Sequence, residues 1–258
     1  MKVSAESQDF EAQRNCPYLD NGFCQVCTCD KCENGFLMNE LREAQKIGYS
    51  NISPKECSCV RIARNRKRIR DSGLDRLVER CTFENFNVKE PWQSTIKETA
   101  LEYLKEYSTK GFFISGQSGS GKTHICTSIC NAIMEKGGRL KYLQWVRDGT
   151  RLKQLINERA EYDKEIRKLI EIPYLYIDDL FKQEVTSADI RLVYEIINGR
   201  CISDRPTIIS SERSLNYIKH VREGDGEAVA GRIFEMCGKG QYCIEVSGKD
   251  KNQRFKAS

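Results

Sequence analysis

The sequence predicts an α/β fold in which a parallel five-stranded sheet lies between helices, preceded by a small cysteine-rich domain. Residues 116–123, GQSGSGKT, form a glycine-rich turn between a short apolar run and a helical pattern. Apolar runs and helical patterns then alternate, which is typical of a parallel sheet covered on both faces. Five cysteines lie within residues 16–32, ahead of this pattern. We therefore expect two domains, residues 1–80 and 81–258.

The composition indicates a soluble chain. Of the 258 residues 31% are charged, and no apolar run approaches the ~20 residues that a membrane-spanning helix needs. The first ten residues, MKVSAESQDF, lack the apolar core of a signal peptide. We expect a cytoplasmic protein without a membrane partner. The net charge of +5 does not by itself indicate a nucleic-acid partner.

The N-terminal cysteines are predicted to bind zinc. Eight of the 13 cysteines lie between Cys16 and Cys81, and a reducing compartment disfavours disulfides among them. Tetrahedral zinc takes four soft donors, and a C-x2-C pair presents two thiolates from one turn. One such pair precedes a tight turn, ENGF, and a second pair in KECSCVR would close the site from across a loop. We favour the ligands Cys29, Cys32, Cys57 and Cys59.

Other ligand sets remain open. Cys24 and Cys27 form a competing C-x2-C pair, with Cys16 as a further donor. A reduced cluster without metal is the remaining alternative. The two histidines, His124 and His220, lie far downstream, so an all-cysteine site is expected.

A basic segment, VRIARNRKRIRDSGL, follows Cys59 directly. Such a run suits contact with the phosphate backbone of single-stranded DNA or with an acidic protein surface. A solvated helix face is an equally good interpretation. The basic residues are Arg61, Arg64, Arg66, Lys67, Arg68 and Arg70.

The glycine-rich turn matches the pattern G-x-x-x-x-G-K-[ST] of a phosphate-binding loop in full, between a strand and a helix. Its glycines allow backbone N–H groups to curl around phosphates without Cβ clashes. Lys122 would reach the β- and γ-phosphates, and Thr123 would hold a magnesium ion. We therefore expect a nucleotide site formed by Gly116, Gln117, Ser118, Gly119, Ser120, Gly121, Lys122, Thr123 and His124.

Two adjacent aspartates are expected to complete this site. In YLYIDD, residues 174–177 form a buried strand, and Asp178 and Asp179 lie at its tip. Asp178 suits the magnesium shell, and Asp179 suits the orientation or deprotonation of the attacking water. The alternative, an acidic loop without such a role, is hard to maintain beside a phosphate-binding loop.

The other elements follow from periodicity. Residues 92–107 place an apolar stripe on one face of a helix, residues 148–170 form one long amphipathic helix, and a further helix covers 188–202. The segment PTIISSE ends in the polar residues Ser210, Ser211 and Glu212, which either sense the γ-phosphate or lead into a helix capped by Ser214. The expected strands are 112–115, 142–145, 174–178, 206–211 and 242–246.

These segments together resemble the DnaC/DnaI-type replicative helicase loaders, a branch of the AAA+ ATPases that includes many phage-encoded members. The resemblance covers nearly the whole chain and rests on CDKCENGF, CSC, TFENF, GQSGSGKTH, YLYIDDLFK, RPTIISSE and AGRIFEM. It implies an AAA+ core in which Lys122 and Thr123 bind ATP and Mg²⁺, with Asp178 and Asp179 as the acidic pair.

The resemblance also implies partners and further site residues. Arg232 resembles the arginine finger that reaches a neighbouring subunit's nucleotide, and Arg254 is a candidate for the second sensor arginine. Glu212 stands where many AAA+ members have a sensor asparagine, which is a departure from the family. The implied protein is an ATPase that self-associates through its ATPase domain. It docks on a DnaB-type hexameric helicase through its zinc domain and delivers the helicase onto single-stranded DNA during replication initiation.

Three other interpretations compete with a loader. An IstB-type transposition ATPase shares the core but usually lacks the cysteine module. A zinc-bearing DNA-binding regulator would use ATP only as a conformational switch. A small-molecule kinase would need an acceptor site and a mobile arginine-bearing lid, which only HVREGDGEAVAGR remotely offers.

Overall fold

The computed structural model describes residues 19–20, 23–24, 42, 46, 59–60, 75–78, 80–248 and 250–254. The chain divides into two compact units, Met1–Arg68 and Ile69–Ser258. In the first unit, β1 (Leu19–Asp20) pairs with β2 (Phe23–Cys24) in antiparallel orientation. The boundary predicted between residues 80 and 81 falls after α4 (Asp75–Val78), which belongs to the second unit.

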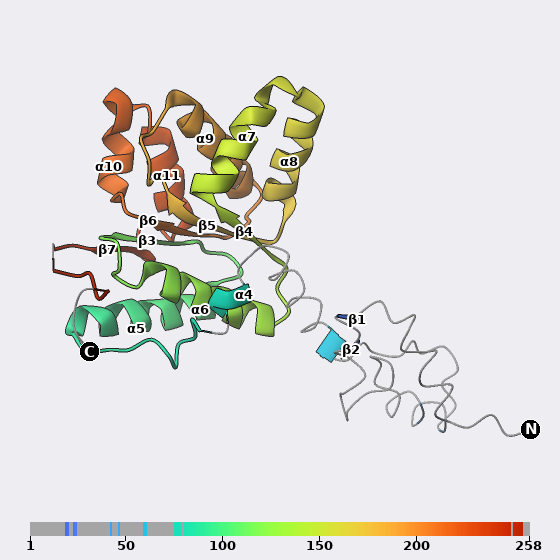
Figure 1. Cartoon of the computed structure of the whole chain (residues 1–258), viewed down its shortest axis with the longest axis vertical. Helices are drawn as coiled ribbons and strands as arrows, with labels where there is room; N and C mark the ends of the chain where they lie inside the picture. Colours follow the sequence, from blue (N-terminus) through green and yellow to red (C-terminus); the bar gives the residue numbers. More distant parts are fainter. Residues whose placement is uncertain are drawn as a thin grey trace, which may run out of the picture. The chain divides into compact units, whose positions relative to one another are not determined.

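The second unit contains a parallel sheet with helices on both faces (Figure 1). Its strand order is β4-β5-β6-β3-β7, and every neighbouring pair is parallel. The predicted five-stranded parallel sheet is therefore confirmed, with small differences at the strand ends. The strands are β3 (Phe112–Gly116), β4 (Leu140–Gln144), β5 (Tyr174–Leu180), β6 (Thr207–Ser211) and β7 (Cys243–Val246).

One face of the sheet is covered by α5 (Pro91–Glu106) and α6 (Lys122–Glu135), with α4 beside α6 (Figure 1). The start of α5 is fixed by Pro91 in its first turn and by a capping box between Glu90 and Gln93. Its predicted apolar stripe faces the core, where the Tyr103 ring packs against the rings of Phe112 and Tyr242 with centroids 5.2 and 5.3 Å away.

The other face is covered by the remaining helices (Figure 1). The last two helices pack against each other, and α10 begins as predicted, because Ser214 Oγ accepts a hydrogen bond from the Tyr217 N–H at 3.1 Å. Within the described residues, no helix is long and apolar enough to cross a membrane. The helices are α7 (Thr150–Gln154), α8 (Arg159–Glu171), α9 (Ser187–Ile202), α10 (Leu215–His220) and α11 (Glu227–Met236).

The prediction of one continuous helix over 148–170 was wrong. A π-helical turn at Trp145–Gly149 leads into α7, a 3₁₀ turn follows at Leu155–Asn157, and α8 starts afresh. The break lies at Glu158, whose φ of −106° and ψ of 70° are not helical. Lys153 of α7 forms an ion pair of 2.7 Å with Asp189 of α9. This contact ties α7 to α9, separately from α8.

Arg200 of α9 is fully buried and ties the amino-terminal ends of β5 and β6 to α8. Its guanidinium donates hydrogen bonds to the carbonyl groups of Leu169, Ile170, Ile172, Pro173 and Pro206 and to Thr207 Oγ1. A buried cation needs such partners. This arrangement fixes the two strands whose opposite ends carry the acidic residues described next.

Candidate nucleotide site

A cavity of about 430 Å³ lies where β3, β5 and β6 end. The carboxyl ends of parallel strands are the usual place for a ligand in an open α/β sheet. Its wall includes Asp179 near the end of β5, Lys182 just after β5 and Glu212 just after β6. The turn after β3 and the start of α6 contribute Ser118, Gly119, Gly121, Lys122, Thr123 and His124.

The turn between β3 and α6 needs its glycines. Gly119 and Gly121 have φ of +76° and +87°, in the left-handed region that favours glycine. A Cβ on Gly121 would lie 2.9 Å from the Phe86 ring, and a Cβ on Gly119 would collide with the Asn252 side chain. The loop is thus packed tightly from outside and can present its backbone N–H groups inward.

Lys122 begins α6 and is largely buried. Its ammonium donates to the carbonyl groups of Gly116 at 2.8 Å and Gln117 at 2.9 Å. Burial lowers the pKa of Lys122, and the carboxylates of Glu212 and Asp179 act in the opposite direction. The ammonium is therefore held by the loop, and Lys122 lines the same cavity as the acidic residues.

Asp178 accepts four hydrogen bonds. Its carboxylate accepts a hydrogen bond of 3.2 Å from the Thr123 hydroxyl, and this bond joins the two residues predicted to hold magnesium. The hydroxyl groups of Tyr176 and Tyr142 donate at 2.7 and 2.9 Å, and Ser210 donates as well. Burial raises the pKa of both tyrosines, so they remain protonated donors.

These oxygens fit Mg²⁺, which usually takes one or two carboxylates and completes its shell with water and phosphate oxygens. The tyrosines were missed in the sequence analysis, although a signal was present. Tyr176 and Asp178 are two residues apart on one strand and share a face, and Tyr142 pairs in register with Tyr176.

Asp179 points in a different direction from Asp178. Its φ of 55° is unusual for a residue with a side chain, and such strain often marks functional positions. The Asp179 N–H donates to Ser210 Oγ at 3.1 Å. The carboxylate lines the cavity and forms an ion pair with the ammonium of Lys182 at 2.8 Å. The strand geometry thus separates the two acids, one toward Thr123 and one toward the open cavity.

The segment TFENF supports the loop, a role that the sequence did not reveal. The Phe86 ring meets the His124 ring edge-on at 5.3 Å and packs against Gly121. His124 Nε2 lies 2.9 Å from the Thr82 carbonyl oxygen. Leu77 and Cys81, just before this segment, provide an apolar wall of the cavity.

The segment after β7 contacts the loop from another side. The Gln253 N–H donates to the Gly119 carbonyl at 3.0 Å, and the Lys251 N–H donates to Gln117 Oε1 at 3.2 Å. Arg254 lines the cavity together with residues of the phosphate-binding loop, and its role as a second sensor arginine stays a prediction.

Arg232 lies elsewhere. It sits on α11, where its guanidinium forms an ion pair of 2.8 Å with Glu235. Among the residues that the structure describes, Arg232 is not part of the cavity wall.

The predicted zinc ligands Cys29, Cys32 and Cys57 lie outside the described residues, and so do the basic residues from Arg61 to Arg70. Cys59 is described and half-buried. Within the described part of the chain, no cluster of three or more His, Cys, Asp or Glu side chains is suited to a metal ion. Zinc binding therefore stays a prediction.

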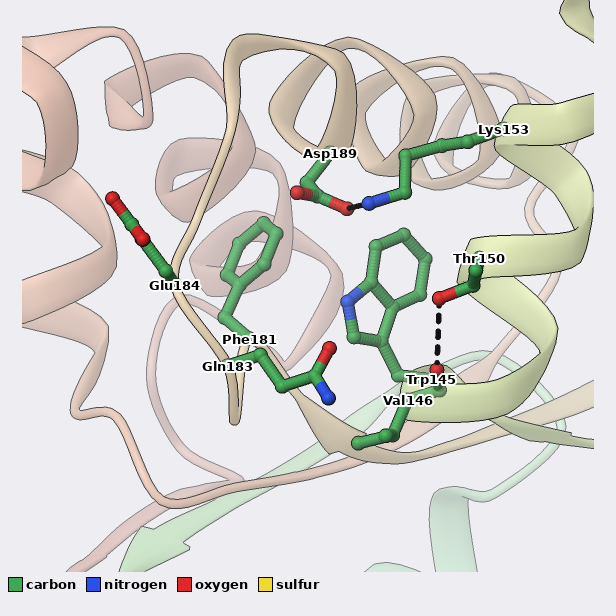
Figure 2. A pocket seen from close by; sticks show the side chains of 8 residues that line it. All are labelled: Trp145, Val146, Thr150, Lys153, Phe181, Gln183, Glu184 and Asp189. Atoms are coloured by element: carbon green, nitrogen blue, oxygen red, sulfur yellow. Dashed lines mark hydrogen bonds and ion pairs between the residues drawn. The ribbon is translucent and has the colours of Figure 1, made fainter.

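The loop after β5 also borders a second, smaller cavity of about 20 Å³ (Figure 2). That volume holds about one water molecule. The Phe181 ring meets the Trp145 ring edge-on at 5.9 Å, and the Lys153–Asp189 ion pair lies beside the indole (Figure 2). One short loop therefore contacts both the nucleotide cavity and α7.

The fold and this site define an ATP-binding protein of the AAA+ type. A family model described as IstB-like ATP binding protein matches residues 55–249, and the chain belongs to this family. Its relatives confirm the resemblance to the DnaC/DnaI-type loaders.

The chain is 30% identical over 233 residues to the uncharacterized protein YqaM of Bacillus subtilis (strain 168), covering 84% of this chain and 71% of YqaM. It is 25% identical over 185 residues to the replicative helicase loader DnaC of Escherichia coli (strain K12), covering 69% of this chain and 76% of DnaC. The crystal structure of DnaI has the same fold, with a TM-score of 0.55, 20% identity, and coverage of 68% of this chain and 93% of that one.

Proposed function

We propose that this protein is an ATPase that binds a replicative hexameric helicase of the DnaB type and delivers it onto single-stranded DNA. The observation that carries this proposal is the similarity to the helicase loader DnaC over 69% of the chain. The nucleotide site supports it, because a loader that works through ATP needs a phosphate loop, magnesium ligands and an acid at the cavity.

In this proposal each side chain of the site has its own role in binding or hydrolysing ATP. The Lys122 ammonium offsets the charge of the β- and γ-phosphates, and Arg254 reaches the phosphates from the segment after β7. The Thr123 hydroxyl and the Asp178 carboxylate hold Mg²⁺, which supplies charge neutralisation when bound. The Asp179 carboxylate orients the attacking water and accepts its proton. Leu77 and Cys81 contact the apolar face of the base.

Arg232 is proposed to act on a neighbouring subunit. Its side chain is 37% exposed and lies outside the cavity of its own chain, as described above. A guanidinium is permanently charged and binds phosphate oxygens with two N–H groups. Self-association through the ATPase unit would bring Arg232 to the ATP of the next copy.

The N-terminal unit is proposed to dock on the helicase. Zinc held by Cys29, Cys32, Cys57 and Cys59 would give this unit its fold. The basic residues from Arg61 to Arg70 would contact the phosphates of single-stranded DNA, with an affinity that falls as salt rises.

A loading assay tests the proposal. The full chain, the hexameric helicase of its host and a single-stranded circle are mixed with ATP, and unwinding is measured. We expect stimulation by the wild-type chain and none by Lys122→Ala, which lacks the charge that meets the phosphates. The family model favours one competitor, a transposition ATPase. Binding to a transposase, with no binding to the helicase, would replace the loader with that function.

A further inference from the structure

Lys182 adds a positive charge to the nucleotide cavity, and the function above gives it no role. Its ammonium lies 2.8 Å from Asp179 Oδ2 and 3.4 Å from Glu212 Oε1. It therefore bridges two carboxylates at the carboxyl ends of neighbouring strands, one near the end of β5 and one just after β6. The Lys182 side chain is 40% exposed, whereas those of Asp179 and Glu212 are 21% and 28% exposed.

The bridge lies near the ammonium of Lys122. Burial has the largest effect on the pKa of Lys122 and lowers it, the charges of Glu212 and Asp179 raise it, and the charge of Lys182 lowers it. Asp179, Lys182 and Glu212 line the same cavity as Lys122, and the effect of a charge weakens with distance. Lys122 is the residue that meets the β- and γ-phosphates in a loop of this kind. The bridge thus borders the outer-phosphate end of the site.

Asp179 has a proposed role in hydrolysis, but unpaired carboxylates at this end also repel the outer phosphates of a bound triphosphate. Asp179 and Glu212 together bring two negative charges, and each repels an anionic phosphate group. The Lys182 ammonium neutralises one of these charges. The hydrogen bond from Lys182 to Asp179 raises the pKa of the lysine, so the ammonium keeps its proton.

We propose that Lys182 and Glu212 set the charge at the outer-phosphate end of the site and so determine how strongly it prefers ATP over ADP. The ammonium favours the third phosphate, and the Glu212 carboxylate opposes it. This inference rests on the nucleotide site of the proposed function.

If the bridge had only a structural role, different effects of substituting its residues would be expected. A structural role would lower the melting temperature when the bridge is removed and would affect both nucleotides alike. Ion pairs that are this exposed contribute little to folding, so we expect the melting temperature to change little. The chain contains a matched control pair on α10 and α11. Lys219 lies 3.4 Å from Glu227, and neither residue lines the cavity.

The test measures dissociation constants of the full chain for magnesium complexes of ADP and of a non-hydrolysable ATP analogue, by calorimetry. Lys182→Met should weaken binding of the ATP analogue at least about fivefold, the effect of one charge at ~4 Å in a medium like water. ADP binding should change much less. Glu212→Gln alone should tighten binding of the ATP analogue, and the double variant should recover most of the loss.

Two further variants serve as controls. Lys182→Arg keeps the charge and should keep the preference for ATP, and Lys219→Met should leave both constants unchanged. Equal losses for ATP and ADP in Lys182→Met, or no recovery on adding Glu212→Gln, would overturn the inference. A wild-type chain that binds ATP but loads no helicase would defeat the proposed function alone. A wild-type chain that binds no nucleotide would defeat both.

Discussion

The Thr123 hydroxyl at the start of α6 donates a hydrogen bond of 3.2 Å to the Asp178 carboxylate on β5. This contact joins the phosphate-binding loop to the acidic strand end, two segments that lie 55 residues apart in the sequence. Tyr142 and Tyr176 hold the same carboxylate from the core side. The residues predicted to hold magnesium are thus oriented by the fold itself, while Asp179 lines the cavity.

Asp179→Asn should bind ATP but hydrolyse it roughly 10²-fold more slowly, since an amide cannot accept the proton of the attacking water. Nucleotide affinity by calorimetry and phosphate release by a coupled assay separate the two effects. Asp163→Asn, on the exposed surface of α8, is the control. Wild-type turnover by Asp179→Asn would remove Asp179 from the reaction.

Arg232→Ala should bind ATP normally as a monomer and lose ~10³-fold or more of the hydrolysis that assembly stimulates. Mixing it with Lys122→Ala should restore part of the activity, because some interfaces then pair an intact Lys122 with an intact Arg232. Turnover is measured with helicase and single-stranded DNA present. If Arg232→Ala weakens ATP binding by the isolated monomer, the arginine acts within its own chain.

The full chain should carry about one zinc ion, because four thiolates complete a tetrahedral site. Elemental analysis of the purified protein measures this directly. Cys29→Ser and Cys57→Ser should release the metal and abolish helicase binding while ATP binding persists, and Cys201→Ser, in the ATPase unit, should change nothing. Loss of metal only in variants of Cys16, Cys24 or Cys27 would identify the other ligand set.

Arg200→Met should lower the free energy of unfolding by about 3 kcal/mol or more, because several carbonyl groups lose the hydrogen bonds that the guanidinium donates to them. Urea unfolding followed by circular dichroism gives the value. Arg191→Met changes an exposed arginine on the same helix and should have little effect. A small change for Arg200→Met would mean that the carbonyl groups find water instead.

The strands, the phosphate loop and the acidic pair were predictable because each is a local pattern. The contacts of Phe86 with Gly121 and of Tyr142 with Asp178 were not, because they join segments whose approach depends on the packed fold. The break at Glu158 escaped detection for another reason. Neither glycine nor proline marks it, and the apolar periodicity continues across it, although α7 is held by Lys153 and Asp189.

The second cavity gives the protein a built-in optical reporter. The chain has two tryptophans. The indole of Trp145 touches the Phe181 ring, two residues after Asp179, whereas Trp92 lies under the ammonium of Lys251, 5.4 Å from its ring centre. Each indole therefore contacts a different segment beside the nucleotide site. Replacing one or the other by phenylalanine yields two chains whose intrinsic fluorescence follows the loop after β5 and the segment after β7 separately, with no attached dye.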